Sequence, residues 1–270
     1  MKCYYHKEDY DGICSAAIVA KANKGVELIG SNYHTIPTGK NDTIIIVDLS
    51  FSKPVMERLL KDGNSIIWID HHKTAIAQLE DFNFPGIRKI GVGACELTWQ
   101  YFFENSLTPL AVKYVSDYDV WKHQNPSTLI FQYGLRGYSE SYDPESGLWT
   151  DLLQPDVSGL VYQLLDDGEK ILNYQEIQDA MYAKGMSYTT AWEGYRVLAI
   201  NAPFKGSMVA KSMFCDKLHD FIVLFGTRGD EWKYSLYSEN PAIDVSEIAF
   251  KYGGGGHAEA AGFYSSRRLL

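Results

Sequence analysis

The stretch Ser65-Ile66-Ile67-Trp68-Ile69-Asp70-His71-His72 places an acid and two imidazoles directly behind a run of apolar residues. Apolar side chains at successive positions need cover on both faces of a strand. This is typical of a central strand in a parallel sheet with helices on either side. Residues 65–72 are therefore predicted to form a buried strand with polar groups at its carboxyl end.

Other short apolar runs in the first half have the same character, and they are Lys2–His6, Glu27–Tyr33 and Thr43–Ser50. Helix-like stretches separate them. Around Val55–Leu60, for example, Ser52 and Pro54 favour a helix start and Gly63 favours a stop. Strands that alternate with helices indicate an α/β fold with a parallel sheet.

The second half has a different pattern. Residues from about 154 to 195 are polar and helix-like, and three strands are predicted after them: Arg196–Asn201, Phe221–Phe225 and Trp232–Ser238. Helices are predicted at Val209–Lys217 and, behind a capping box that starts at Asp244, at Ile248–Tyr252. We expect an α/β fold with a parallel-sheet domain at residues 1–185, which includes the helical connector, and a smaller α/β domain at residues 196–270, with the active site in the interdomain cleft.

The composition excludes several classes of protein. The 270 residues are 46% hydrophobic and 22% charged, as in ordinary globular proteins. A net charge of −9 disfavours binding to duplex DNA. No apolar run approaches the ~20 residues of a membrane span, so we expect a cytoplasmic protein without a membrane partner. The cysteines lie too far apart for a zinc ribbon: Cys3, Cys14, Cys95 and Cys215.

Potential metal ligands follow the predicted strands. They are His6, Asp9 and Asp11 after the first, Asp48 after the third, and Asp70, His71 and His72 after the fourth. The carboxyl ends of parallel strands meet at one edge of the sheet, where ligands gather. Buried carboxylates are costly unless they are paired or bound to a metal. Carboxylates with imidazoles suit two divalent ions, Mn²⁺ first, with Mg²⁺ or Co²⁺ as substitutes.

Two further acids, Asp117 and Asp119, lie in the apolar stretch Val115–Trp121. Each is either a ligand or a cap at the end of a helix.

These residues closely resemble the motifs of the DHH phosphoesterase family. The motifs correspond to His6–Gly12, Asp48, Asp70-His71-His72 and Asp117 within Ser116–Trp121. The block Gly253–His257, followed by Ala260–Phe263, resembles the signature of the DHH-associated substrate-binding domain. The resemblance spans nearly the whole chain.

The resemblance implies a role for each residue. One metal is held by His6, Asp9 and Asp48, and a second by Asp11, Asp48, His71 and Asp117. As a catalytic pair, Asp70 orients the histidines and His72 donates to the substrate phosphate.

The glycine block suggests how the substrate is held. Backbone N–H groups of Gly254, Gly255 and Gly256 can form a nest for an anionic oxygen, with His257 beside it, although a flexible hinge would also use such glycines. Nanoribonuclease-like relatives carry an arginine where this chain has Tyr237. Arg136 or Arg228 is a candidate for the missing cation.

The resulting hypothesis is a Mn²⁺-dependent phosphodiesterase that releases mononucleotides from the end of a short single-stranded oligonucleotide or a dinucleotide. Relatives of this kind degrade very short RNA or DNA, cleave linear dinucleotides, or remove the 3′-phosphate of 3′,5′-bisphosphonucleosides. The alternatives are a pyrophosphatase or exopolyphosphatase, because the metal chemistry is the same, and a regulator that binds a nucleotide without cleaving it.

Overall fold

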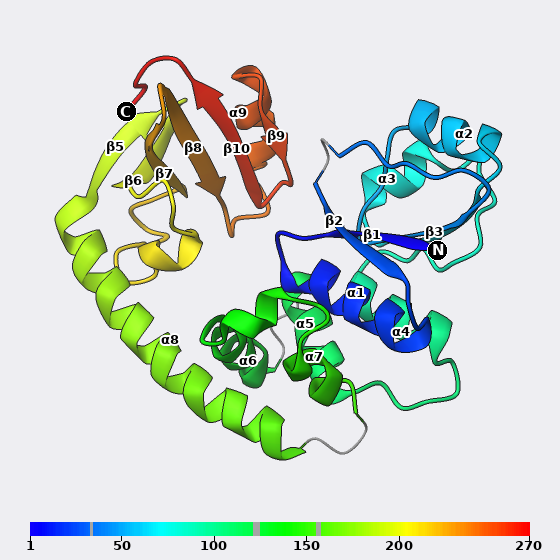
Figure 1. The fold of residues 1–270 in the computed structure, drawn as a ribbon. Coiled ribbons are helices and arrows are strands. Elements are labelled where there is room, and N and C mark those ends of the chain that lie inside the picture. The colour runs from blue at the N-terminus through cyan, green and yellow to red at the C-terminus, as the bar shows by residue number, and fades with distance from the viewer. Residues whose placement is uncertain (33–34, 121–124, 155–157) are drawn as a thin grey trace. The chain divides into compact units, whose positions relative to one another are not determined.

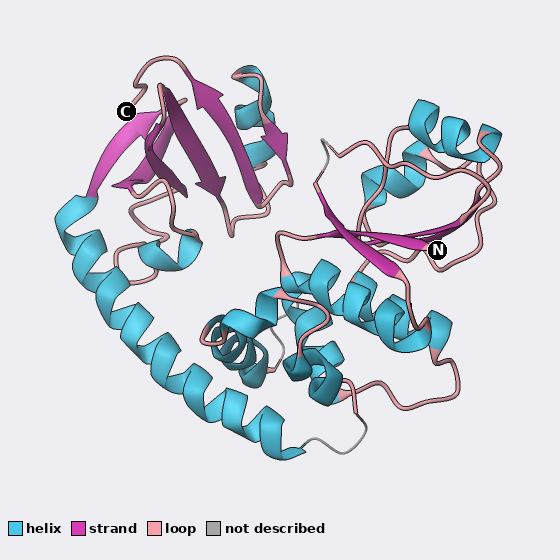
Figure 2. Cartoon of the chain, in the orientation of Figure 1, coloured by secondary structure: helices cyan, strands magenta, loops and turns pink. Residues whose placement is uncertain are grey.

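The computed structural model describes residues 1–32, 35–120, 125–154 and 158–270. It contains two compact units, Met1–Leu172 and Asn173–Leu270, and each has its own sheet (Figures 1 and 2). The division lies within the long helix α8 (Ser158–Met186), which occupies most of the predicted connector. No helix in the described ranges has both the length and the apolar character to cross a bilayer.

The first unit contains the predicted parallel sheet, with strand order β2-β1-β3-β4. The strands are β1 (Lys2–His6), β2 (Glu27–Ser31), β3 (Thr43–Val47) and β4 (Ser65–Ile69). Strands β2, β3 and β4 end earlier than predicted, so Asp48 lies just beyond β3 and the triplet from Asp70 to His72 just beyond β4. The polar groups therefore leave the sheet at its carboxyl edge.

Helices cover both faces of this sheet. On one face lie α1 (Tyr10–Ala22), α4 (Ala94–Phe102), α5 (Leu110–Asp119), α6 (Pro126–Arg136), the 3₁₀ turn η1 (Ser139–Tyr142) and α7 (Gly147–Leu152), and on the other lie α2 (Lys53–Lys61) and α3 (Lys73–Gln78). Ile45 and Val47 pack into the first core, whereas Ile44 and Ile46 pack into the second. Because each such side chain stabilises the fold by about 1.5–3 kcal/mol when buried, the unbroken apolar run in β3 fixes its central position.

The second unit is built on a mixed sheet with order β5-β6-β7-β8-β10-β9, in which only β6 and β7 are parallel. Its elements are β5 (Ser187–Trp192), β6 (Tyr195–Asn201), the 3₁₀ turn η2 (Ser207–Ala210), β7 (Phe221–Arg228), β8 (Glu231–Tyr237), α9 (Val245–Lys251), β9 (Gly255–Gly256) and β10 (Ala260–Ser265). The predicted cap is present, since Oδ1 of Asp244 accepts from the N–H of Ser246. The α/β class of the whole chain is thereby confirmed.

One expectation in this unit was wrong. Val209–Lys217 is not a helix: beyond the short 3₁₀ turn η2, which ends at Ala210, it consists of turns. Only Val209 and Ala210 are buried there, so no apolar face holds a helix in place. The glycine block, for which the sequence suggested a nest or a hinge, contains a short strand, since Gly255 and Gly256 pair with β10. A side chain on Gly256 would not fit, because its Cβ would lie 2.5 Å from the carbonyl oxygen of Ala260.

Candidate metal centre

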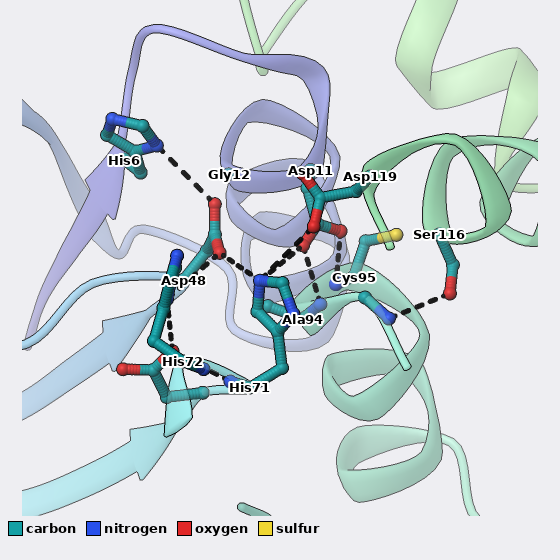
Figure 3. Close-up of polar contacts among 12 residues, drawn as sticks. His6, Asp11, Gly12, Asp48, His71, His72, Ala94, Cys95, Ser116 and Asp119 are labelled. Carbon is teal, nitrogen blue, oxygen red and sulfur yellow. Dashed lines mark hydrogen bonds and ion pairs between the residues drawn. The ribbon is translucent and has the colours of Figure 1, made fainter. Parts of the chain in front are cut away.

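At the carboxyl edge of the parallel sheet, acids and imidazoles converge from four stretches of the chain: the β1–α1 region, the ends of β3 and β4, and α5 (Figure 3). Among the described residues, three groups have ligand atoms within 4.8 Å of one another. They are His6, Asp9 and Asp48; Asp48, His71 and His72; and Asp11, His71 and Asp119. All of these residues belong to the first unit.

Asp9 reaches this edge because it caps α1. Its Oδ1 accepts from the N–H of Gly12 at 3.0 Å, and its Oδ2 lies 2.8 Å from Nδ1 of His6. The turn between β1 and α1 is tight, since a Cβ on Gly12 would lie 1.9 Å from the carbonyl oxygen of His6. The glycine of the first motif therefore allows Asp9 and His6 to meet.

Asp11 is held by the backbone of another helix. Its Oδ2 accepts from the N–H of Ala94 at 2.6 Å and its Oδ1 from the N–H of Cys95 at 2.8 Å, both in the first turn of α4. The preceding N–H, of Gly93, donates to Oγ of Ser116, which donates in turn to Glu96. The N-terminus of α4 thus stabilises a buried carboxylate through its N–H groups and the helix dipole.

Asp48 stands between the two sides of the centre. It is 1% exposed and has a positive φ of 52°, a backbone conformation that costs free energy for a residue with a side chain. Its Oδ1 lies 3.2 Å from Nε2 of His71, and its Oδ2 lies 3.7 Å from Nδ1 of His6. The two oxygens therefore serve different groups of ligands, as expected of a bridging carboxylate.

The structure corrects one predicted ligand. Oδ2 of Asp119 lies 3.2 Å from Nε2 of His71, whereas none of the three groups formed by described residues includes Asp117. Residues two positions apart on a helix point about 200° away from each other, so Asp117 and Asp119 cannot both face the centre. Helix phase also distinguishes them, because Val112, Val115 and Asp119 follow the spacing of one helix face.

Asp70 is fully buried and organises the end of the triplet. Its Oδ1 accepts from the N–H groups of His71 and His72 and lies 2.7 Å from Nδ1 of His72, while its Oδ2 accepts from Trp68. Because Nδ1 of His72 bonds to Asp70, Nε2 is the ring nitrogen that remains for a substrate. Asp70 therefore orients His72 directly but contacts only the backbone of His71.

The titration behaviour reflects crowded negative charge. The carboxylates of Asp48 and Asp9 raise the pKa of His6 to about 10. Burial lowers the pKa of His71, but its hydrogen bond with Asp48 and the surrounding acids outweigh burial and raise that pKa to about 10. Burial and the charge of Asp48 raise the pKa of Asp119 to about 7, and burial with neighbouring acids raises the pKa of Asp11 well above its ordinary value. A divalent cation among these groups would compensate the negative charge and favour release of protons from them.

The donor atoms fit divalent ions of the first transition row and Mg²⁺. Each side of the centre offers carboxylate oxygens and an imidazole nitrogen, a set that suits Mn²⁺ or Mg²⁺. His6, Asp9 and Asp48 could hold one ion, and Asp11, Asp48, His71 and Asp119 a second.

A cavity of about 150 Å³ opens beside the centre. Asp9, Asp11 and Asp119 line it together with Arg136 from the end of α6. Of the two arginines considered from the sequence, Arg136 thus lies in the same unit as the ligands. His72 lines a different cavity, of about 370 Å³, together with residues before α2 and in α3.

The other predicted substrate residues lie in the second unit. The N–H of Gly254 already donates to the carbonyl of Ala249 at the end of α9, so it is occupied within the fold. Gly255 and Gly256 form β9, and the side chain of His257 is exposed in the turn that follows. Tyr237 is half-buried and packs with residues of the second unit's own core.

Comparisons with known proteins agree with this geometry. Residues 3–115 match the DHH family, N-terminal domain. The chain is 31% identical over 233 residues to an uncharacterized protein of Acanthamoeba polyphaga mimivirus, covering 83% of this chain and 53% of the viral protein. It is 26% identical over 294 residues to the oligoribonuclease NrnB of Bacillus subtilis, covering 96% of this chain and 71% of that enzyme. The chain therefore spans about half the length of the viral relative.

Solved structures share the fold at low sequence identity. The DHH domain of a member of a ribosomal protein family has a TM-score of 0.64 at 12% identity, covering 97% of this chain and 81% of that one. A pGpG-specific phosphodiesterase, PggH of Vibrio cholerae, has a TM-score of 0.56 at 13% identity, covering 97% of this chain and 92% of that one.

Proposed function

Because this chain belongs to the DHH family, we propose that it is a metal-dependent phosphodiesterase that hydrolyses short oligonucleotides or dinucleotides from one end. The observation that carries the proposal is Asp48, whose two oxygens face the imidazoles of His6 and His71 in two adjoining groups of ligands. Two divalent ions held in this way activate water and stabilise negative charge on phosphoryl oxygens.

The protein's own residues position the metal ligands and the group that binds the phosphate. Asp11 and Asp119 complete the side of His71, and Asp9 completes the side of His6. The backbone of α4 orients Asp11, and Asp70 keeps His72 oriented so that, in the imidazolium form, its Nε2 can donate to a phosphate oxygen. We assign no covalent role to any side chain, since water is the nucleophile in this scheme.

The substrate class rests on the relatives. NrnB is named an oligoribonuclease and PggH a pGpG-specific phosphodiesterase, and we extend that class, a short strand cut to mononucleotides, to this chain. The glycines of β9 and His257 are proposed to grip the substrate in the same reaction. Gly254 contributes shape rather than a donor, because its N–H is already engaged.

The test is hydrolysis by the purified chain with Mn²⁺, Mg²⁺ or Co²⁺, or with a chelator. The substrates are a dinucleotide, longer single-stranded RNA and DNA, a 3′,5′-bisphosphonucleoside, pyrophosphate and polyphosphate. We expect metal-dependent conversion of the dinucleotide to mononucleotides, fastest with Mn²⁺. Turnover of pyrophosphate or polyphosphate alone would replace the proposal with a pyrophosphatase, and tight nucleotide binding without turnover would replace it with a regulator.

A further inference from the structure

The cavity beside the metal centre is large enough for a phosphate group. Its volume is about 150 Å³, several times the roughly 30 Å³ that one water molecule takes up in the liquid, so a group of five heavy atoms fits. The lining residues are Glu8, Asp9, Tyr10, Asp11, Val115, Tyr118, Asp119, Gln132, Arg136 and Tyr142.

Arg136 is held in place by two tyrosine rings. Its Nη2 donates to the hydroxyl of Tyr118 at 3.0 Å, and its guanidinium lies 4.7 Å from the ring centre of Tyr133 and 5.9 Å from that of Tyr118. Aromatic stacking fixes the plane of the guanidinium, so less conformational entropy is lost when its N–H groups bind a ligand. With described residues Arg136 makes one hydrogen bond, although a guanidinium carries five N–H donors.

The cavity is lined by charges of both signs. Three carboxylates of the metal centre and that of Glu8 line it, and Arg136 is the sole cationic side chain among the lining residues named above. A phosphate in contact with the ions would be neutralised by them, whereas Arg136 has no part in the ligand groups. A guanidinium with a fixed plane matches a phosphate bidentately.

We propose that Arg136 and this cavity bind a second phosphate of the substrate, a terminal phosphomonoester next to the bond that is cleaved. The inference rests on the proposed function and narrows it: the enzyme prefers dinucleotides that carry a terminal phosphate. The shared chemistry is a phosphomonoester, at either the 5′ or the 3′ end. Tyr133 acts as a positioning residue, because it does not line the cavity and would act on the phosphate only through Arg136, whereas Tyr118 both positions Arg136 and lines the cavity.

The experiment measures kcat/KM with Mn²⁺ for three versions of one dinucleotide: without a terminal phosphate, with a 5′-phosphate and with a 3′-phosphate. For the wild type we expect one phosphorylated version to be preferred by roughly 10- to 100-fold, the range for hydrogen bonds to a charged group. Arg136→Gln should reduce that preference to near parity. Arg136→Lys should keep part of it, because charge without the planar fork binds less well.

Arg228 provides a matched comparison. It forms the same kind of pair, with Nη1 donating to the hydroxyl of Tyr264 at 2.7 Å, but in the second unit. If Arg228→Gln rather than Arg136→Gln removes the preference, the assignment is wrong. Equal losses on all three substrates, with a lower melting temperature and no rescue by lysine, would make Arg136 a structural residue. Equal wild-type rates on all three would refute the inference and leave the phosphodiesterase intact, whereas hydrolysis of none would refute the proposed function itself.

Discussion

Oδ1 of Asp48 lies 3.2 Å from Nε2 of His71, and its other oxygen faces His6. A single carboxylate therefore belongs to both sides of the centre, so removal of its charge should affect both groups of ligands at once.

Asp48→Asn is expected to abolish binding of both ions rather than one. Asparagine tolerates the positive φ of position 48, and loss of the charge relieves repulsion with Asp11 and Asp119. The metal-free variant should therefore be at least as stable to heat as the metal-free wild type. Calorimetric titration with Mn²⁺ and thermal unfolding check both points. Retention of two-ion binding would exclude a bridging role.

Asp119→Asn and Asp117→Asn form a matched pair on α5. The first removes a neighbour of His71 and should reduce hydrolysis by at least about 100-fold, since even residues that only orient ligands are worth 10–100-fold. The second changes the same charge on another face of the helix and should leave hydrolysis near the wild-type rate. The reverse order of effects would restore Asp117 as the ligand.

Ser116→Ala is expected to loosen the start of α4. The hydroxyl of Ser116 accepts from the buried N–H of Gly93 and donates to Glu96, and an unsatisfied buried group costs about 1–3 kcal/mol. Denaturant unfolding should show that loss, and Mn²⁺ titration should show about 10-fold weaker binding at the side of Asp11.

The control is Ser15→Ala. Ser15 is also fully buried, but its hydroxyl has no hydrogen-bond partner among the described residues. Its removal should leave Mn²⁺ binding unchanged and should not lower stability, so comparable losses in both variants would mean that the contacts of Ser116 are not responsible.

Gly12→Ala should separate β1 from α1. The new Cβ would meet the backbone carbonyl of His6, which cannot rotate away, so we expect destabilisation of about 1–3 kcal/mol or more together with loss of metal binding. Gly185→Ala in α8 is the control, because a Cβ there meets open space and alanine favours a helix. Equal stability of the two variants would contradict the close approach at Gly12.

The hydrogen bonds of His219 in the second unit lead us to expect a lower free energy of unfolding in acid. Its Nδ1 accepts from the N–H of Cys215 and its Nε2 lies 2.9 Å from Oγ1 of Thr189, so protonation would set two donors against each other. Burial lowers its pKa below the ordinary value of 6.5, and Arg196 adds to this shift. The stabilisation is complete above about pH 6.5 and falls as the pH drops through the lowered folded-state pKa.

A comparison with His219→Gln isolates this effect from the other histidines. The difference in melting temperature between wild type and variant should shrink from about pH 8 to about pH 5. A difference that stays constant over that range would mean that His219 remains neutral or makes no net contribution.

Most of the first unit could be predicted from sequence because its signals are local. Consecutive apolar residues in β3 and β4 identify central strands, and an acid or imidazole directly after each strand must lie at the sheet edge. Asp48 and His71 were found in this way. The choice between Asp117 and Asp119 needed helix phase, and the spacing from Val112 and Val115 to Asp119 contains that signal.

Other features depend on residues far apart in the chain. Asp11 and Cys95 are 84 positions apart, and no local pattern connects them. The selection of Arg136 over Arg228 required knowledge of which arginine lines a cavity with the ligands. The segment Val209–Lys217 has the composition of a helix, but only Val209 and Ala210 are buried in it and Phe214 is partly buried, so most of its surface has no apolar partner.

The hydrogen bonds from α4 to Asp11 determine which substitutions are tolerated at the start of that helix. The two groups that fix the carboxylate are main-chain N–H groups, which Ala94 and Cys95 would offer with almost any side chain. Alanine scanning would pass over both positions without detecting their role, whereas a proline at either one would delete a donor. Relatives can therefore carry other small residues at these two buried positions and still present the same acid at the same angle.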